Sequence, residues 1–143
     1  LVGSEMCIRD SYKTGSVPQA LKADSFSGGT ALQLPLYLRA AQELLGDEAT
    51  VELAAYRYVT ERGGYRTIAF TRDALDEREA ELLAILDTIA SGIASGRFFA
   101  GVAAGGCRHC DYKGVCGVLA EAAARFKTDD EAFRDYRTMQ EIE

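Results

Sequence analysis

The sequence predicts one domain of the α/β (α+β) class, in which helices cover a small mixed sheet. Three features indicate this class: an apolar repeat with helical spacing, two strand-like segments around a Gly-Gly pair, and a second, longer helical stripe. A chain of 143 residues with 48% hydrophobic content is long enough to bury one core. Helices beside a hairpin in one domain form a two-layer arrangement.

The first regular element that we expect is a helix that begins at Thr30 and ends before Gly46. Leucine and alanine recur at helical spacing between these residues, Thr30 is a suitable cap, and glycine commonly ends helices. Pro35 lies too far in to be a first-turn proline on that boundary. The helix therefore begins nearer Leu34 or has a distorted first turn.

A hairpin follows, with strands predicted at 49–60 and 65–70 and a tight turn at Gly63-Gly64. The alternating positions of the first strand are Val51, Leu53 and Ala55 on one side and Glu52, Ala54 and Tyr56 on the other.

A long helix is then predicted over residues 73–94. Its apolar stripe consists of Leu82, Leu86, Ile89 and Ile93, and its solvent face of Glu77, Arg78, Glu79 and Glu81. Residues 96–106 show no period, 120–126 read as helical, and 129–143 form a charged and helical tail.

Three cysteines near the C-terminus indicate a metal site. Cys107, Cys110 and Cys116 are spaced so that a loop and one helical turn can bring the thiolates to one point. A tetrahedral zinc site or a cluster iron needs a fourth ligand, for which the candidates in the chain are His109 and Cys7. The alternative is three idle or buried thiols, although the polar neighbours do not resemble a core.

Composition excludes some classes of protein. No apolar run approaches the ~20 residues of a membrane helix, and bunched cysteines without a secretory leader favour a reducing cytoplasm. The net charge of −6 argues against extensive electrostatic wrapping of nucleic acid. The excess acidity belongs to residues 41–90, so a local phosphate-binding surface elsewhere remains open.

Two further motifs lie upstream of the cysteines. Tyr12-Lys13-Thr14-Gly15 ends a possible strand, and Gln33 and Tyr37 lie one helical turn apart on one face. Alone, a Tyr-Lys-Thr-Gly segment is more often a solvated turn, and a Gln-x-x-x-Tyr pair on an apolar helix more often lies at the edge of a hydrophobic core. In this order with the cysteine tail, they resemble the PD-(D/E)XK nuclease domain of the RecB/AddB type, across about residues 12–117.

This resemblance implies a restriction-endonuclease-like core that cuts DNA with Mg²⁺ or Mn²⁺. Lys13 matches the catalytic lysine, and Gln33 and Tyr37 match residues that organise the site. Cys107, Cys110 and Cys116 match ligands of a [4Fe-4S] cluster whose fourth ligand is missing here. The implied partners are DNA and a helicase, fused or separate, in a helicase–nuclease that repairs DNA breaks.

The departures from the family pattern concern the acidic ligands. The family has a carboxylate two positions before the lysine, where this chain has Ser11, and Asp10 belongs to the opposite face of a strand. Residues 1–10 read as a weak strand and resemble translated adapter read-through. We therefore expect residues 1–11 to be non-native or disordered. Residues 12–143 would be the C-terminal part of one nuclease domain whose intact form cuts DNA, and this fragment would be inactive because it lacks the acidic metal ligands.

Two other readings compete with this one. A non-catalytic module could hold Zn²⁺ through the cysteines and present the acidic helix at 73–95 to a protein partner, but it leaves the other two motifs unexplained. A nuclease fold could also have lost catalysis and now bind DNA or scaffold a complex, because a fold alone does not fix function.

Overall fold

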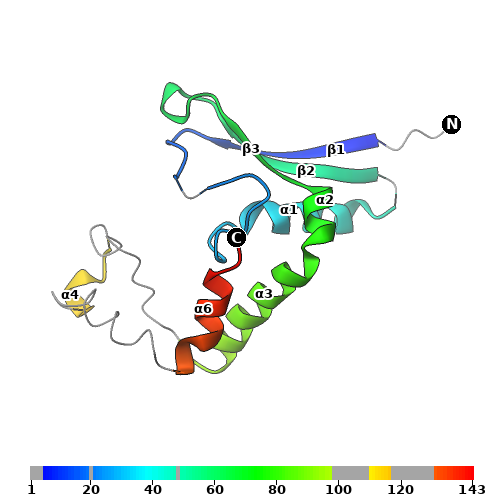
Figure 1. Ribbon diagram of the computed structural model, residues 1–143. Helices are drawn as coiled ribbons and strands as arrows, with labels where there is room; N and C mark the ends of the chain where they lie inside the picture. Colours follow the sequence, from blue (N-terminus) through cyan, green and yellow to red (C-terminus); the bar gives the residue numbers. More distant parts are fainter. Residues whose placement is uncertain (1–4, 20, 48, 98–109, 117–130) are drawn as a thin grey trace.

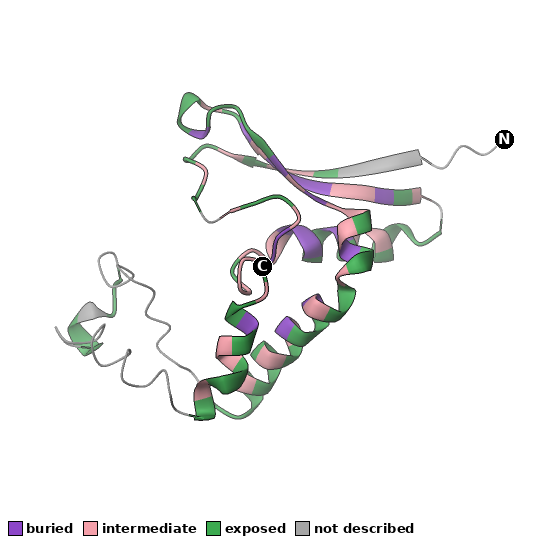
Figure 2. Ribbon diagram, in the orientation of Figure 1, coloured by how far each residue is buried: buried purple, intermediate pink, exposed green. Residues whose placement is uncertain are grey.

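The computed structural model shows a mixed three-stranded sheet with helices packed on it, which confirms the predicted fold class (Figure 1). It describes residues 5–19, 21–47, 49–97, 110–116 and 131–143. The strand order is β1-β2-β3, with β1 (Glu5–Lys13) parallel to β2 (Ala49–Tyr58) and β3 (Thr67–Thr71) antiparallel to β2. One buried apolar cluster joins this sheet to the helices (Figure 2).

Strand β1 forms where the sequence showed only a weak strand pattern. Its pairing with β2 runs from Glu5 opposite Ala49 to Lys13 opposite Tyr58, so tertiary pairing supplies what the local pattern lacks. The segment expected to be non-native or disordered therefore contributes residues 5–11 to the sheet. That these residues are foreign to the natural protein stays a prediction.

A bulge in β2 overturns the predicted alternation of that strand. Cys7 lies opposite Val51 but the next residue, Ile8, lies opposite Leu53, which leaves Glu52 as an extra residue. The two faces therefore exchange at this point, and Ala54 is fully buried on the core side. The predicted single face of Val51, Leu53 and Ala55 is wrong beyond the bulge.

Helix α1 (Gln33–Leu45) packs on the sheet. Thr30 does not cap it, because its hydroxyl donates to the carbonyl of Ser27 at 2.6 Å. Pro35 falls in the first turn, where backbone N–H groups have no helical acceptor. The alternative start nearer Leu34 is thus confirmed.

The end of α1 is fastened to the strands by Gln42. Gly46 ends the helix as predicted, with a positive φ of 58° that favours glycine. The Gln42 amide donates to the carbonyls of Gly46 and Ala49, at 2.7 and 3.0 Å. Its oxygen accepts from the backbone N–H of Val51 at 2.9 Å and from Arg72 at 2.8 Å. No pattern in the sequence singles out this glutamine.

The β2–β3 connection is longer than the predicted tight turn. Residues 59–66 separate the strands and include a 3₁₀ turn, η1 (Glu61–Gly63). A Cβ on Gly63 would lie 2.5 Å from the Cβ of Tyr58, so only glycine fits there. Gly64 and Tyr65 both have positive φ, which is uncommon for tyrosine.

The predicted long helix is two helices, α2 (Arg72–Glu77) and α3 (Glu79–Ala94), broken at Arg78. Arg78 is not on the solvent face, because its guanidinium lies 4.6 Å from the Phe26 ring centroid and donates to the Asp24 carbonyl at 2.6 Å. Leu82 is fully buried as predicted. Of the rest of the stripe, Leu86 is partly buried, Ile89 and Ile93 are exposed, and the unpredicted Ile85 is fully buried.

Three short elements complete the described chain: α4 (Lys113–Cys116), η3 (Glu131–Phe133) and α6 (Arg134–Gln140). Helix α6 packs beside α3 (Figure 1). The helix predicted at 120–126 lies outside the described residues. Within the described residues, none of the helices has the length and apolarity needed to cross a bilayer.

Candidate functional site

Lys13, Gln33 and Tyr37 meet on one face of the sheet. The Lys13 ammonium, at the end of β1, donates to Gln33 Oε1 at 3.3 Å. The Gln33 amide, in the first turn of α1, donates to the Tyr37 hydroxyl at 2.8 Å. The structure therefore joins two motifs that lie twenty residues apart in the sequence.

Tyr56 belongs to the same cluster and was not predicted. Its hydroxyl donates to Gln33 Oε1 at 2.9 Å, and the Lys13 Nζ lies 4.5 Å from its ring centroid. Burial is the main cause that raises the pKa of Tyr56, and the neighbouring Tyr58 and Tyr37 add to it. The sequence shows a tyrosine at position 56 of the predicted strand, but because of the bulge at Glu52 regular alternation assigns it to the wrong face.

Arg9 adds a second cation beside the cluster. Its guanidinium lies 5.5 Å from the Tyr37 ring centroid, within cation–π range. Arg9, Ser11 and Lys13 alternate along β1 and share the face that α1 covers. This face thus presents two cations with a hydroxyl between them.

Asp10 points to the other face, as expected from strand alternation. Its Oδ2 accepts from Arg57 Nε at 2.7 Å, while its Oδ1 is buried and has no hydrogen-bond partner among the described residues. Asp10 therefore does not replace the carboxylate that Ser11 lacks.

The donor set around Lys13 does not fit a hard divalent metal. It offers a hydroxyl, an amide and phenols, whereas Mg²⁺ in proteins takes carboxylates together with water and phosphates. In the part of the chain that the structure describes, no three His, Cys, Asp or Glu residues gather as metal ligands.

The cysteine motif is described only in part. Cys110 and Cys116 are exposed free thiols, the second at the end of α4. Thiolates suit both zinc and iron–sulfur clusters, so the chemistry of these two donors fits either group. Cys107 and His109 lie outside the described residues, and the side chain of Cys7 is not described.

A hollow of about 560 Å³ opens beside Lys13. Tyr56 and Tyr58 from β2 line it, together with Ser27 and Thr30 from the loop that leads into α1. It therefore combines a cation, hydroxyl groups and aromatic walls.

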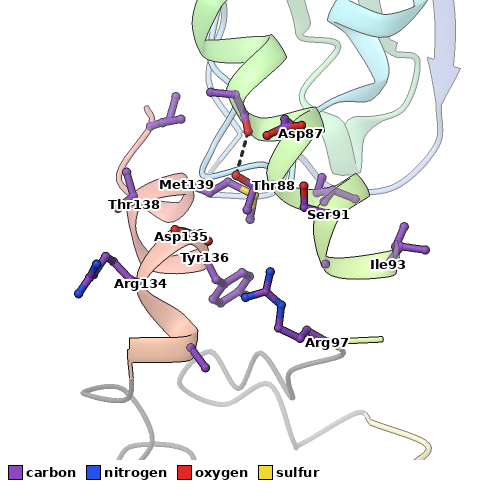
Figure 3. A pocket seen from close by; sticks show the side chains of 15 residues that line it. Asp87, Thr88, Ser91, Ile93, Arg97, Arg134, Asp135, Tyr136, Thr138 and Met139 are labelled. Carbon is purple, nitrogen blue, oxygen red and sulfur yellow. Dashed lines mark hydrogen bonds between the residues drawn. The ribbon is translucent and has the colours of Figure 1, made fainter. Parts of the chain in front are cut away.

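A second cavity of about 630 Å³ lies between α3 and α6 (Figure 3). Arg97, Tyr136 and Met139 are among the residues that line it, and Figure 3 shows Arg97 directed toward the Tyr136 ring. None of the cluster residues Lys13, Gln33, Tyr37 and Tyr56 lines this cavity.

Comparison with known families decides what this arrangement belongs to. The family model of the PD-(D/E)XK nuclease superfamily matches residues 3–117, most of the chain. The chain belongs to the PD-(D/E)XK nuclease superfamily. Searches of curated proteins and of solved structures found no match. Membership of this nuclease superfamily implies that the domain interacts with DNA, and the match includes Lys13, Gln33 and Tyr37.

Proposed function

We propose that this domain is the phosphate-holding part of a metal-dependent DNA nuclease, of the RecB/AddB type. The observation that supports the proposal is the hydrogen-bonded chain from Lys13 through Gln33 to Tyr37, which lies within residues 3–117, the part of the chain that the superfamily model matches. In this proposal Lys13 is the catalytic lysine, and Gln33 and Tyr37 organise the site.

The chemistry of the cluster suits a phosphodiester. An ammonium fixed by hydrogen bonds stabilises negative charge on a phosphate better than a freely rotating one, because it does not have to reorganise. Gln33 Oε1 holds Lys13 Nζ at 3.3 Å, and the Tyr56 ring lies against the ammonium. Arg9 supplies a second positive charge on the same face.

We propose further that the 143-residue chain itself does not hydrolyse DNA. The position two residues before Lys13 carries the Ser11 hydroxyl, and the nearest carboxylate on β1, Asp10, is held by Arg57 on the opposite face. In the intact parent, Mg²⁺ or Mn²⁺ bound by carboxylates would polarise the phosphate and activate water. The parent, in this proposal, is the nuclease part of a cytoplasmic helicase–nuclease that processes DNA breaks.

Nuclease assays and binding assays together test the proposal. We expect no degradation of linear DNA above background with Mg²⁺ or Mn²⁺, for the chain and for Lys13→Ala alike. Fluorescence anisotropy at low salt should show DNA binding that Lys13→Ala weakens. Robust degradation that Lys13→Ala abolishes would contradict the proposed inactivity, and the absence of DNA binding would contradict the role in holding phosphate.

For the cysteine motif we propose a [4Fe-4S] cluster bound by Cys107, Cys110 and Cys116, with a fourth ligand from elsewhere in the parent. The resemblance in cysteine spacing favours the cluster, and the exposed thiols of Cys110 and Cys116 are available as ligands. Anaerobic purification distinguishes the two chemistries. A brown protein with visible absorbance supports the cluster, whereas a colourless protein with stoichiometric zinc supports the alternative of a zinc-binding interaction module.

A further inference from the structure

The loop between β2 and β3, residues 59–66, extends beyond the end of β1 at the same end of the sheet as Lys13 (Figure 1). Two hydrogen bonds tie the loop to that strand end. The Val59 N–H donates to the Lys13 carbonyl at 3.0 Å, and the Thr60 hydroxyl donates to the Thr14 carbonyl at 3.1 Å. The loop is therefore a fixed neighbour of the proposed phosphate site.

This loop exposes an aromatic ring. The Tyr65 side chain is 67% exposed although its backbone has φ 52°, a conformation that glycine adopts without steric cost. Gly63, two residues before Tyr65, packs directly on Tyr58, which lines the hollow beside Lys13. The loop is therefore packed on Tyr58, and it holds Tyr65 in a backbone conformation that is unfavourable for tyrosine, with the ring exposed to solvent.

Two arginines flank the ring. Among the described residues, neither Arg62 nor Arg66 has an ion pair or a side-chain hydrogen bond, and both are exposed. Glu61 is the loop's single acidic residue, so the loop is positive in a chain whose net charge is −6. Charge and aromaticity together match the surfaces that bind single-stranded nucleic acid, where bases stack on rings and cations contact phosphates.

We propose that residues 59–66 bind the single strand of DNA that leads to the phosphate beside Lys13. Tyr65 stacks on a base, and Arg62 and Arg66 contact the flanking phosphates. This inference rests on the proposed function, and it specifies the form of the substrate as single-stranded DNA.

The test is anisotropy of a labelled oligothymidylate with the full chain and with variants. Tyr65→Ala removes the ring and leaves the backbone conformation unchanged, so we expect affinity to fall about five-fold or more. Tyr65→Phe keeps the ring and should therefore retain the affinity of the unmodified chain. The matched control is Tyr112→Ala, because Tyr112 is 72% exposed but lies between Cys110 and Cys116 and not in the loop, and this variant should bind like the unmodified chain.

The arginines are tested through salt dependence. For a single strand, each lost phosphate contact reduces the slope of log affinity against log salt by about 0.7, so Arg62→Ala with Arg66→Ala should reduce it by about 1.4. Arg134→Ala, which removes an exposed arginine paired with Glu131 at the other side of the molecule, should leave the slope unchanged.

The outcomes separate this inference from the proposed function. If Lys13→Ala weakens binding but Tyr65→Ala does not, the loop is not the binding surface and the proposed function stands. If Tyr65→Ala weakens binding to duplex DNA of equal length as much as it weakens binding to the single strand, the loop contacts duplex DNA and the inference is wrong. If neither DNA binds the unmodified chain, both the proposed function and the inference fail.

Discussion

Lys13 Nζ and Gln33 Oε1 lie 3.3 Å apart and connect the end of a strand to the first turn of a helix. The same amide oxygen accepts from the Tyr56 hydroxyl at 2.9 Å, and the amide nitrogen donates to Tyr37. Gln33 is therefore the centre of the cluster, because all three partners contact it.

Replacing Gln33 by leucine should destabilise the fold and weaken DNA binding. The partly buried Tyr56 hydroxyl would lose its acceptor, and because a fully buried unsatisfied donor costs about 1–3 kcal/mol, we expect a loss toward the lower end of that range. Urea unfolding gives this free energy. The matched control is Gln140→Leu, since Gln140 also donates to a tyrosine four residues away, Tyr136, but at an exposed position of α6. Equal losses in both variants would show that Gln33 has no special role.

The convergence of Lys13, Gln33 and Tyr37 could be predicted from sequence, because helical spacing places two of them on one face and the resemblance to the nuclease family implied that the third lies nearby. Tyr56 could not be predicted in the same way. The regular alternation of β2 assigns Tyr56 to the same face as Glu52, and only the extra residue at Glu52 turns the later half of the strand. A bulge depends on pairing between strands, which local sequence does not report.

Tyr56 should make stability fall at alkaline pH. Its pKa is raised in the folded state, so the folded protein holds this proton more tightly than the unfolded chain does. The resulting stabilisation is fully present below the unfolded pKa of about 10, and it is lost as the pH rises through the folded pKa. The free energy of unfolding, measured with urea between pH 8 and 11, should therefore fall less steeply with pH for Tyr56→Phe than for the unmodified chain. The control is Tyr112→Phe at an exposed position, and a slope equally changed by both substitutions would contradict this assignment.

Asp10→Ala should separate the two faces of β1. Its ion pair with Arg57 is partly exposed, and such pairs contribute roughly 0–1 kcal/mol, so we expect a small loss of stability in urea unfolding. DNA binding at low salt should not weaken, because Asp10 lies on the face opposite Lys13. Lys13→Ala is the comparison, with the converse result expected: weaker DNA binding. A loss of binding in Asp10→Ala comparable to that in Lys13→Ala would mean that both faces contribute to the site.

Gly63→Ala should destabilise the hairpin that carries the proposed DNA-binding loop. The new Cβ would lie 2.5 Å from the Cβ and 2.8 Å from the Cδ1 of Tyr58, so the strand or the loop must shift, at a cost of about 1–3 kcal/mol. Gly15→Ala is the control, because no atom lies within 4 Å of its added Cβ. Thermal unfolding of both variants gives the comparison. A Gly63→Ala protein as stable as Gly15→Ala would show that the loop is not packed on Tyr58 as described.

Arg78 shows a second limit of sequence patterns. It lies among glutamates at the predicted solvent face of a long helix, yet the helix breaks there and the guanidinium turns inward. Besides Glu81, three residues along the helix, its partners are distant in sequence: the Asp24 carbonyl, the Phe26 ring and the carbonyl of Glu143. Neither periodicity nor charge pattern reports such long-range acceptors.

Arg78→Met should therefore lower the free energy of unfolding far more than the same substitution of a surface arginine. The guanidinium joins the loop before α1 to the C-terminal segment, and hydrogen bonds from a charged group contribute about 1.5–3 kcal/mol each. Arg134→Met is the matched control, because Arg134 likewise pairs with a glutamate three residues away, but in the solvent. Urea unfolding should show a loss of about 2 kcal/mol or more for Arg78→Met and less than about 1 kcal/mol for Arg134→Met.

Hydrogen exchange adds a local measurement: the amides of Phe26 and Gly28, which donate to the carbonyls of Glu143 and Ile142, should exchange faster in Arg78→Met alone. Unchanged exchange at these two amides would show that the C-terminal segment stays in place without the arginine.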